Sequence, residues 1–260
     1  MSSMFKKNIV HRFQRGISLI ELMVAMTIGS FLVLGITQIF ITSQKNYLFQ
    51  QSQLGNQENG RFALAVLGQE LSKAGYRSKP TTLFAASSAV VSGCNFPEGA
   101  SVVALSTTSL CIQYQASNRA EITCQGAALS GADQATIVSP YGQINPLIVE
   151  KIEFDKNTNS ITCTTGGATQ QLVTGVADIH FDYGSGDNKT VTAFGSSPTL
   201  TVGAVRYAAL MQNGTSTIRD TTTVPKVLSD WKNRFGGTVS DNTKIYQIVQ
   251  STIMLRNQMQ

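Results

Sequence analysis

A long apolar stretch near the amino terminus, from Ile17 to Ile41, constrains this chain more than any other feature. As an α-helix, about 25 residues span about 37 Å, which exceeds the roughly 30 Å hydrocarbon core of a bilayer. No acidic residue precedes the stretch, whereas four cations do, at Lys6, Lys7, Arg12 and Arg15. Cationic flanks favour the cytoplasmic side of a membrane. The sequence therefore predicts one spanning helix, with the rest of the chain on the periplasmic or outer side.

One acid, Glu21, interrupts this apolar stretch. A carboxylate inside a spanning helix costs about 3 kcal/mol on insertion scales, so it usually has a partner and a function. The alternative is that Glu21 reaches the polar layer at one membrane face and has no further role.

The residues around Glu21 differ from an ordinary secretory signal, which ends in a small-residue cleavage site after its apolar core. Here Gly16 stands before the apolar stretch, in the sequence GISLIE (Gly16 to Glu21). This pattern resembles the leader of type IV pilins and pseudopilins. The resemblance implies that a prepilin peptidase cuts after Gly16 and methylates Ile17, and that Glu21 serves subunit assembly. The new amine at Ile17, with an ordinary pKa of about 8, would be a cationic partner for Glu21 within one chain or between chains; the resemblance implies pairing between subunits.

The net charge of +5 comes largely from the leader, because without its four cations the remaining Lys and Arg nearly balance 15 acids. No closely spaced run of cations follows residue 16. A basic face is the usual mark of a nucleic-acid-binding domain, so the sequence offers no clear nucleic-acid site.

Four cysteines, Cys94, Cys111, Cys124 and Cys163, lie in the part predicted to be outside the cytoplasm. An even number of cysteines in an oxidising compartment favours disulfides, and four allow three connectivities. We favour Cys94 with Cys111 and Cys124 with Cys163, because each pair closes a loop around neighbouring predicted strands. No metal site is expected, since the chain lacks the C-x-x-C spacing of zinc sites.

The helical pattern continues beyond the apolar stretch, with no proline from Thr42 to Gly75. We expect one helix from about Ser18 to Ala74 that ends at Gly75, and an apolar stripe on it at Phe62, Val66 and Leu67 that packs on a sheet. After Pro80, short alternating segments predict an antiparallel sheet. The expected strands are Leu110 to Gln115, Leu147 to Asp155, Ser160 to Thr164, Leu172 to Tyr183, Val202 to Met211 and Ile245 to Arg256, with a hairpin turn over residues 155–159.

Patches across most of the chain are similar to the PilW-type minor pilins of type IV pilus systems. They are the residues 57–76, the segments around Cys124 and Cys163, residues 172–187 and residues 251–258. Two stretches depart from the family, residues 81–92 and 189–199. The resemblance implies an α+β, type IV pilin-like fold with a long N-terminal helix packed on an antiparallel β-sheet domain. The expected divisions are a leader at 1–16, a transmembrane and filament-core helix at 17–41, the periplasmic half of the helix at 42–76, and a β-rich globular domain at 77–260.

The same resemblance implies a minor pilin that helps to initiate pilus assembly, with a place at the filament tip, and that supports adhesion, twitching motility or DNA uptake. Its partners would be other minor and major pilins, the prepilin peptidase, the inner-membrane assembly platform, and membrane lipid before assembly. It would be a single-pass inner-membrane protein with its C-terminal domain in the periplasm, and later part of the pilus.

Catalysis has little support in the sequence, and we expect no cofactor and no enzymatic activity. His180 is the one histidine after the leader, and Asp178 and Asp182 share its face of the predicted strand. We interpret this face as solvated or interfacial rather than catalytic. Two alternatives stay open: a pseudopilin of a type II secretion system, and a signal-anchored periplasmic enzyme or binding protein that would need neither cleavage nor Glu21.

Overall fold

The computed structural model describes residues 16–88, 91, 93–137, 145–186, 190–197, 202–213 and 223–258. The expected leader, apart from Gly16, lies outside the described residues, as do its four cations and parts of both stretches that depart from the family. The chain divides along the sequence into two compact units, one ending at Tyr47 and the other beginning at Leu48.

Helix α1 (Leu19–Lys73) is continuous over 55 residues, within one residue of the expected bounds at each end. No proline interrupts its hydrogen bonds, and Gly75 takes the left-handed φ of +79° that commonly ends a helix. Asn257 then donates from Nδ2 to the carbonyl oxygens of Ser72 and Ala74, both at 3.3 Å. The end of the helix is therefore fastened to the end of the chain.

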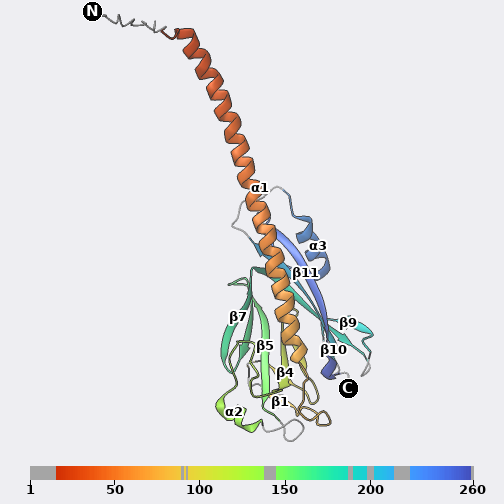
Figure 1. Ribbon diagram of the computed structural model, residues 1–260. Helices are drawn as coiled ribbons and strands as arrows, with labels where there is room; N and C mark the ends of the chain where they lie inside the picture. Colours follow the sequence, from red (N-terminus) through yellow and green to blue (C-terminus); the bar gives the residue numbers. More distant parts are fainter. Residues whose placement is uncertain are drawn as a thin grey trace, which may run out of the picture. The chain divides into compact units, whose positions relative to one another are not determined.

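The second unit contains two larger antiparallel sheets and a two-stranded one (Figure 1). The five-stranded sheet has the order β3 (Val102–Ser106), β4 (Ser109–Gln115), β5 (Leu147–Asp155), β6 (Ser160–Thr165) and β7 (Ala168–Thr174). The four-stranded sheet has the order β11 (Ile245–Met254), β10 (Val202–Asn213), β8 (Val176–Ser185) and β9 (Ala193–Gly195). The small sheet pairs β1 (Ser87–Ser88) with β2 (Asn95–Phe96).

The turn between β3 and β4 accepts backbone hydrogen bonds from both larger sheets. The carbonyl of Thr107 accepts from the N–H of Phe181 in β8 at 2.8 Å, and the carbonyl of Thr108 accepts from the N–H of Phe154 in β5 at 3.1 Å. The main core then includes residues of both sheets and of α1, among them Leu67, Ile152 and Tyr207.

The face of α1 that packs on this core is made of small and polar residues as well as apolar ones. Its buried residues recur at helical spacing: Ser52, Asn56, Gly60, Ala63, Leu67, Glu70 and Leu71. The expected stripe was correct for Leu67 and wrong for Phe62, which is 54% exposed, while Val66 is half-buried. Small side chains let the helix approach the sheets closely, and Phe62 points away from them.

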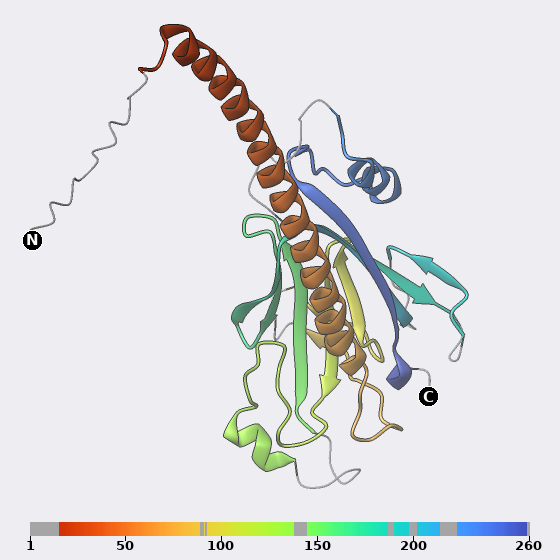
Figure 2. The same ribbon diagram turned by 45° about the horizontal axis from the view of Figure 1, so that its top comes forward.

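The opposite face of the four-stranded sheet is covered by α3 (Lys226–Phe235) (Figure 2). Leu228 and Trp231 of this helix pack with Ala208, Leu210 and Tyr246 in a second, smaller core. Because strand side chains alternate between faces, Tyr207, Ala209 and Met211 of β10 lie in the main core with α1, whereas Ala208 and Leu210 lie in the smaller core with α3.

Several expected strands agree closely with the structure, including β4, β5, β6 and the turn at 155–159 between the last two. The expected strand from Leu172 to Tyr183 was wrong, because Gly175, with φ of +74°, separates β7 from β8 and places them in different sheets. The expectation of one sheet was wrong for the same reason. The last strand ends at Met254, and a short 3₁₀ helix, η1 (Arg256–Gln258), follows it. The sequence patterns did not predict β1, β2, β3, β9, α3 or α2 (Gly131–Thr136).

Gly60 provides a test of the close approach between α1 and the four-stranded sheet. A Cβ at Gly60 would lie 2.7 Å from Cγ1 of Val249, whereas a Cβ at Gly68 would have its nearest neighbours at 3.4 Å. We expect Gly60→Ala to lower the free energy of unfolding by about 1 kcal/mol, because overpacking outweighs the gain in helix propensity. Gly68→Ala should raise it by up to about 1 kcal/mol. Urea unfolding of the full chain in detergent micelles, followed by circular dichroism, measures both, and equal stability of the two variants would contradict the packing argument.

Candidate functional site

The glycine before the apolar stretch lies in an open position. Among the described residues, no heavy atom outside its immediate neighbours lies within 4 Å of a Cβ built at Gly16, and Ile17 is 78% exposed. The bond between these two residues is therefore accessible to an enzyme.

Glu21, in the first turn of α1, accepts a hydrogen bond from the residue just before the helix. Its Oε2 accepts from the backbone N–H of Ser18 at 3.1 Å, and the carbonyl of Ser18 accepts from the N–H of Leu22. This is the carboxylate half of a capping box, in which a residue of the first turn satisfies the free N–H at the helix start. The sequence analysis did not predict this capping role, although a serine followed three residues later by a glutamate, as at Ser18 and Glu21, is the usual sequence signal of a capping box. Glu21 therefore has a local partner within its own chain.

The first part of α1 has no cover among the described residues of its own unit. It is long enough and apolar enough to cross a membrane, and its most apolar window of 18 residues is 0% buried. Large side chains such as Phe31, at 75%, and Ile39, at 72%, are exposed. Such a surface requires lipid or other protein around it.

The face that carries His180 is occupied by structural contacts. Asp182 accepts from Nε and an Nη of Arg206 at 3.1 and 2.8 Å, and lies 3.3 Å from Nε2 of His180. The His180 ring stacks on Phe235 of α3, and Asp178 accepts from Nε1 of Trp231 at 2.9 Å. These contacts fasten α3 to the sheet, which agrees with the interfacial interpretation of this face.

Two disulfides connect the four cysteines, Cys94 with Cys111 and Cys124 with Cys163. This is the pairing that the sequence favoured. The first joins the segment before β2 to β4, and the second joins the loop after β4 to β6. Both therefore attach loops to the five-stranded sheet.

Beneath the second disulfide lies a buried carboxyl group, Glu150 of β5, which the sequence did not single out. Its Oε1 accepts from the N–H of Cys124 at 2.7 Å and from the hydroxyl of Tyr114 at 2.8 Å. Its Oε2 is buried and has no hydrogen-bond partner among the described residues. Desolvation, opposed in part by these hydrogen bonds and by Lys73, raises the pKa of Glu150 to about 7. In the sequence of an alternating strand, a buried acid of this kind cannot be distinguished from an exposed one.

Glu150 could in principle join a metal site, because its carboxylate and the sulfurs of Cys124 and Cys163 lie within 4.8 Å of one another. The two sulfurs are bonded to each other, however, and only a thiolate is a good ligand. The carboxyl of Glu150 instead has a structural role, because its hydrogen bond to the Cys124 N–H holds the Cys124 loop on the sheet.

The raised pKa of Glu150 predicts how this residue makes the stability of the second unit depend on pH. A carboxyl whose pKa rises from about 4.5 when unfolded to about 7 when folded binds its proton more tightly in the folded state. The contribution of Glu150 to folding is therefore fully present below pH 4.5, and up to about 3 kcal/mol of it is lost as the pH rises to 7. Glu150→Gln should remove this component. Unfolding of both proteins at pH 4.5 and pH 7.5 measures the difference, and parallel pH profiles would contradict it.

Two family models match the chain. One, described as the prokaryotic N-terminal methylation motif, matches residues 11–37, and the other, described as type IV pilus-assembly protein W, matches residues 143–257. The first match falls on the apolar N-terminal stretch, and the second falls within the β domain.

No curated protein matches the chain significantly. Among solved structures, the type IV-like pilin TTHA1219 from Thermus thermophilus is similar, with a TM-score of 0.40 and 12% identity over 77% of this chain and 97% of that chain. The assignment rests on the two family models and on the observed architecture, a long apolar N-terminal helix that packs on antiparallel sheets. The two matches support the assignment of this chain as a PilW-type minor pilin of the type IV pilin class.

Proposed function

We propose that this protein is a minor pilin that helps to initiate assembly of a type IV pilus. In this proposal a prepilin peptidase cleaves after Gly16 and methylates Ile17, and residues 17–41 hold the chain in the inner membrane. The rest, with residues 42–76 as the periplasmic half of the helix and 77–260 as the globular domain, faces the periplasm. Assembly then transfers the chain from the membrane into the pilus.

The observation that carries the proposal is the combination of an accessible Gly16–Ile17 bond with an uncovered apolar helix directly after it. A helix of this kind can exchange lipid for other apolar helices without unfolding, since both surroundings leave its backbone hydrogen bonds intact. Removal of the leader also removes four cations that would have to enter the filament core.

Apolar side chains on the outer face of α1 in the second unit support packing between subunits. Leu54 is 65% exposed and Phe62 is 54% exposed, both on the side of the helix away from the sheets. In a filament these residues would contact neighbouring pilins. The expected partners are other minor and major pilins, with the inner-membrane assembly platform during insertion.

A position at the filament tip, and a contribution to adhesion, twitching motility or DNA uptake, belong to the same proposal. They follow from the similarity to the PilW-type minor pilins, which are structural subunits rather than enzymes. The match of the PilW model to residues 143–257 favours a pilus over a secretion pseudopilus.

One prediction of this proposal concerns processing of the leader. Gly16→Arg should block cleavage, because a long cationic side chain replaces the small residue at the proposed cleavage site. Intact-mass spectrometry of the protein from its native membrane should find the unmodified full chain, whereas the unaltered protein should begin at N-methylated Ile17. A normally processed Gly16→Arg variant would count against the peptidase step.

Another prediction of this proposal separates the charge of Glu21 from its capping role. Glu21→Gln keeps an oxygen that can accept from the Ser18 N–H and removes the charge, whereas Glu21→Ala removes both. If Glu21 pairs with the amine of another subunit, both variants should be processed and both should be reduced about tenfold or more in sheared pili, as loss of a charge pair in an apolar environment predicts. Quantitative mass spectrometry of membranes and sheared pili measures this. Normal incorporation of Glu21→Gln would leave only the capping role.

A further inference from the structure

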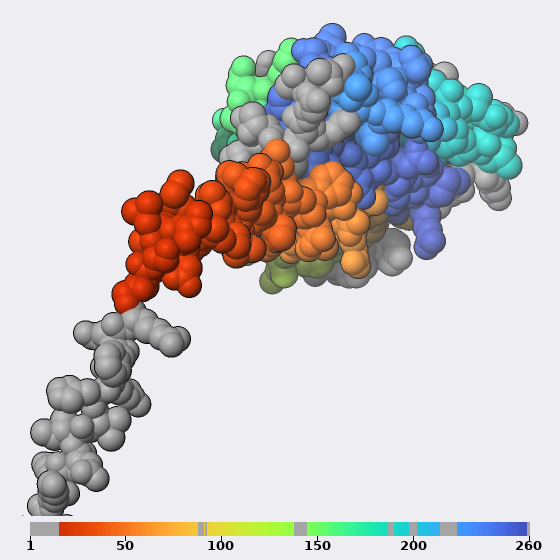
Figure 3. Space-filling view, turned by 90° about the horizontal axis from the view of Figure 1, so that it is seen from above, coloured from red at the N-terminus to blue at the C-terminus, as the bar shows by residue number. Residues whose placement is uncertain are grey.

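The longest free strand edge in the described part of the molecule belongs to β11. This strand is the first of the four-stranded sheet and pairs along 10 residues with β10. On its other side no strand is paired with it among the described residues. Figure 3 shows the C-terminal part of α1 and the C-terminal segment of the chain side by side on the surface.

The register identifies which backbone groups point to the free edge. The N–H of Leu255 donates to the carbonyl of Gly203 at 2.8 Å, in the same register as the rest of the β10–β11 ladder. Antiparallel ladders bond at every second residue, so the odd-numbered residues of β11 bond to β10. The N–H and C=O groups of Ile248, Gln250, Thr252 and Met254 therefore point away from it. An alternating row of donors and acceptors is complementary to another extended backbone.

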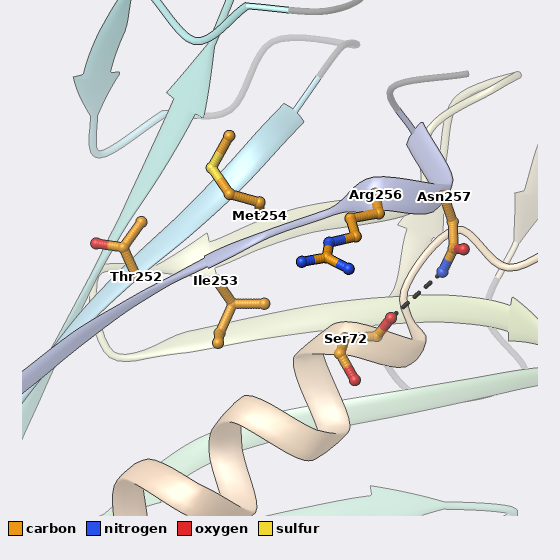
Figure 4. Close-up of a pocket in the computed structure, with 6 residues that line it drawn as sticks. All are labelled: Ser72, Thr252, Ile253, Met254, Arg256 and Asn257. Atoms are coloured by element: carbon orange, nitrogen blue, oxygen red, sulfur yellow. Dashed lines mark hydrogen bonds between the residues drawn. The ribbon is translucent and has the colours of Figure 1, made fainter.

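A groove of about 470 Å³ lies along this edge, at the end of α1 (Figure 4). Its lining residues are Ser72, Thr252, Ile253, Met254, Arg256 and Asn257. Ile253 and the guanidinium of Arg256 lie on the side toward α1, and Thr252 and Met254 lie on the other side. The groove thus has an apolar side chain and a cation on the same side of the strand.

Arg256 gives the groove its chemical preference. Its side chain is exposed, and no acid or other side chain of the described residues pairs with it, whereas Arg206 on the same sheet is paired with Asp182. A guanidinium beside open backbone donors favours a carboxylate. Among the described residues, β7 at one end of the five-stranded sheet also has an unpaired edge, but its seven residues carry no charge.

We propose that the edge of β11 receives an extended segment of another protein subunit, which adds a strand to the sheet and places an aspartate or glutamate on Arg256. An apolar side chain of the same segment lies in the groove beside Ile253. The identification of the partner as another pilus subunit rests on the proposed function; the strand addition itself rests on the register, the groove and Arg256.

A second copy of this chain fits the edge less well. Antiparallel pairing of two β11 edges would bring Arg256, just after the strand, close to Lys244 of the other copy, just before its strand. Parallel pairing would bring the two Arg256 side chains together. Parallel pairing therefore sets cation against cation, which is unfavourable across a strand pair. In the antiparallel arrangement the acid nearest to Lys244, Asp241, is already paired with it at 3.7 Å.

Crosslinking in the native membrane tests the proposal. The photo-reactive residue benzoylphenylalanine would replace Thr252 at the β11 edge and, as the matched control, Gln170 at the β7 edge. After irradiation of membranes and sheared pili, crosslinked peptides are identified by mass spectrometry. We expect the position of Thr252 to crosslink to a segment of another protein with an acidic residue within about three positions, since side chains alternate along an added strand. The β7 position should give no such product.

Arg256 variants in the Thr252-substituted chain test the charge. Arg256→Glu should lower the crosslinking yield about tenfold, as replacement of attraction by repulsion at one contact predicts, and Arg256→Lys should keep most of it. Hydrogen exchange of the unaltered protein gives an independent readout. The amides of Gln250 and Thr252 should exchange at least about tenfold more slowly in pili than in detergent, while the amide of Ile253, bonded to β10, should change little.

Three results would overturn the proposal: crosslinks only to a second copy of this chain, equal or absent crosslinking from the two edges, or an Arg256→Glu yield equal to that of the unaltered residue. Unchanged melting of Arg256→Glu in detergent confirms that its fold is intact. Because the readout is a crosslink rather than processing or piliation, failure of the edge interaction is distinguishable from failure of the proposed function.

Discussion

The hydrogen-bonded backbone of α1 is the element on which the other parts of this structure depend. Over its first part, the helix satisfies its own polar groups and presents an apolar surface that needs lipid or protein around it. Over its last part, the same helix contributes a buried stripe that contains Ala63, Leu67 and Leu71 to the main core. One uninterrupted helix can serve both environments because its backbone needs no partner in either.

The β domain is arranged so that a single helix can cover two sheets. The turn at residues 107–108 of the five-stranded sheet connects to the other sheet through a backbone hydrogen bond from Phe181, and to β5 of its own sheet through one from Phe154. Glycine and other small residues on α1 permit close approach, and Tyr207 donates from its hydroxyl to the carbonyl of Leu64 at 2.8 Å. The far face of the four-stranded sheet is covered by α3 instead, which leaves the edge of β11 open between two covered faces.

Polar groups in the interior hold the loops in place. Glu150 accepts two hydrogen bonds and thereby connects the Cys124 loop and Tyr114 to the middle of the five-stranded sheet. A buried carboxyl of this kind is costly when charged, which is why its pKa rises and why the anchor is strongest at low pH. The disulfide between Cys124 and Cys163 fastens the same loop covalently, so the loop position does not rest on the protonation of one group.

The sequence by itself determined the local features of this protein: the apolar helix, its end at Gly75, the strands β4 to β6 with their turn, and the leader pattern at Gly16 to Glu21. These depend on spacing between residues close in the chain, which periodicity and turn chemistry reveal. Only the tertiary structure decided that Gly175 divides a strand pattern between two sheets, that Phe62 faces outward, and that Glu150 is buried. It also decided which edge of which sheet is free. Such features depend on contacts between residues far apart in the chain, and an alternating pattern of side chains does not specify which partner covers each face.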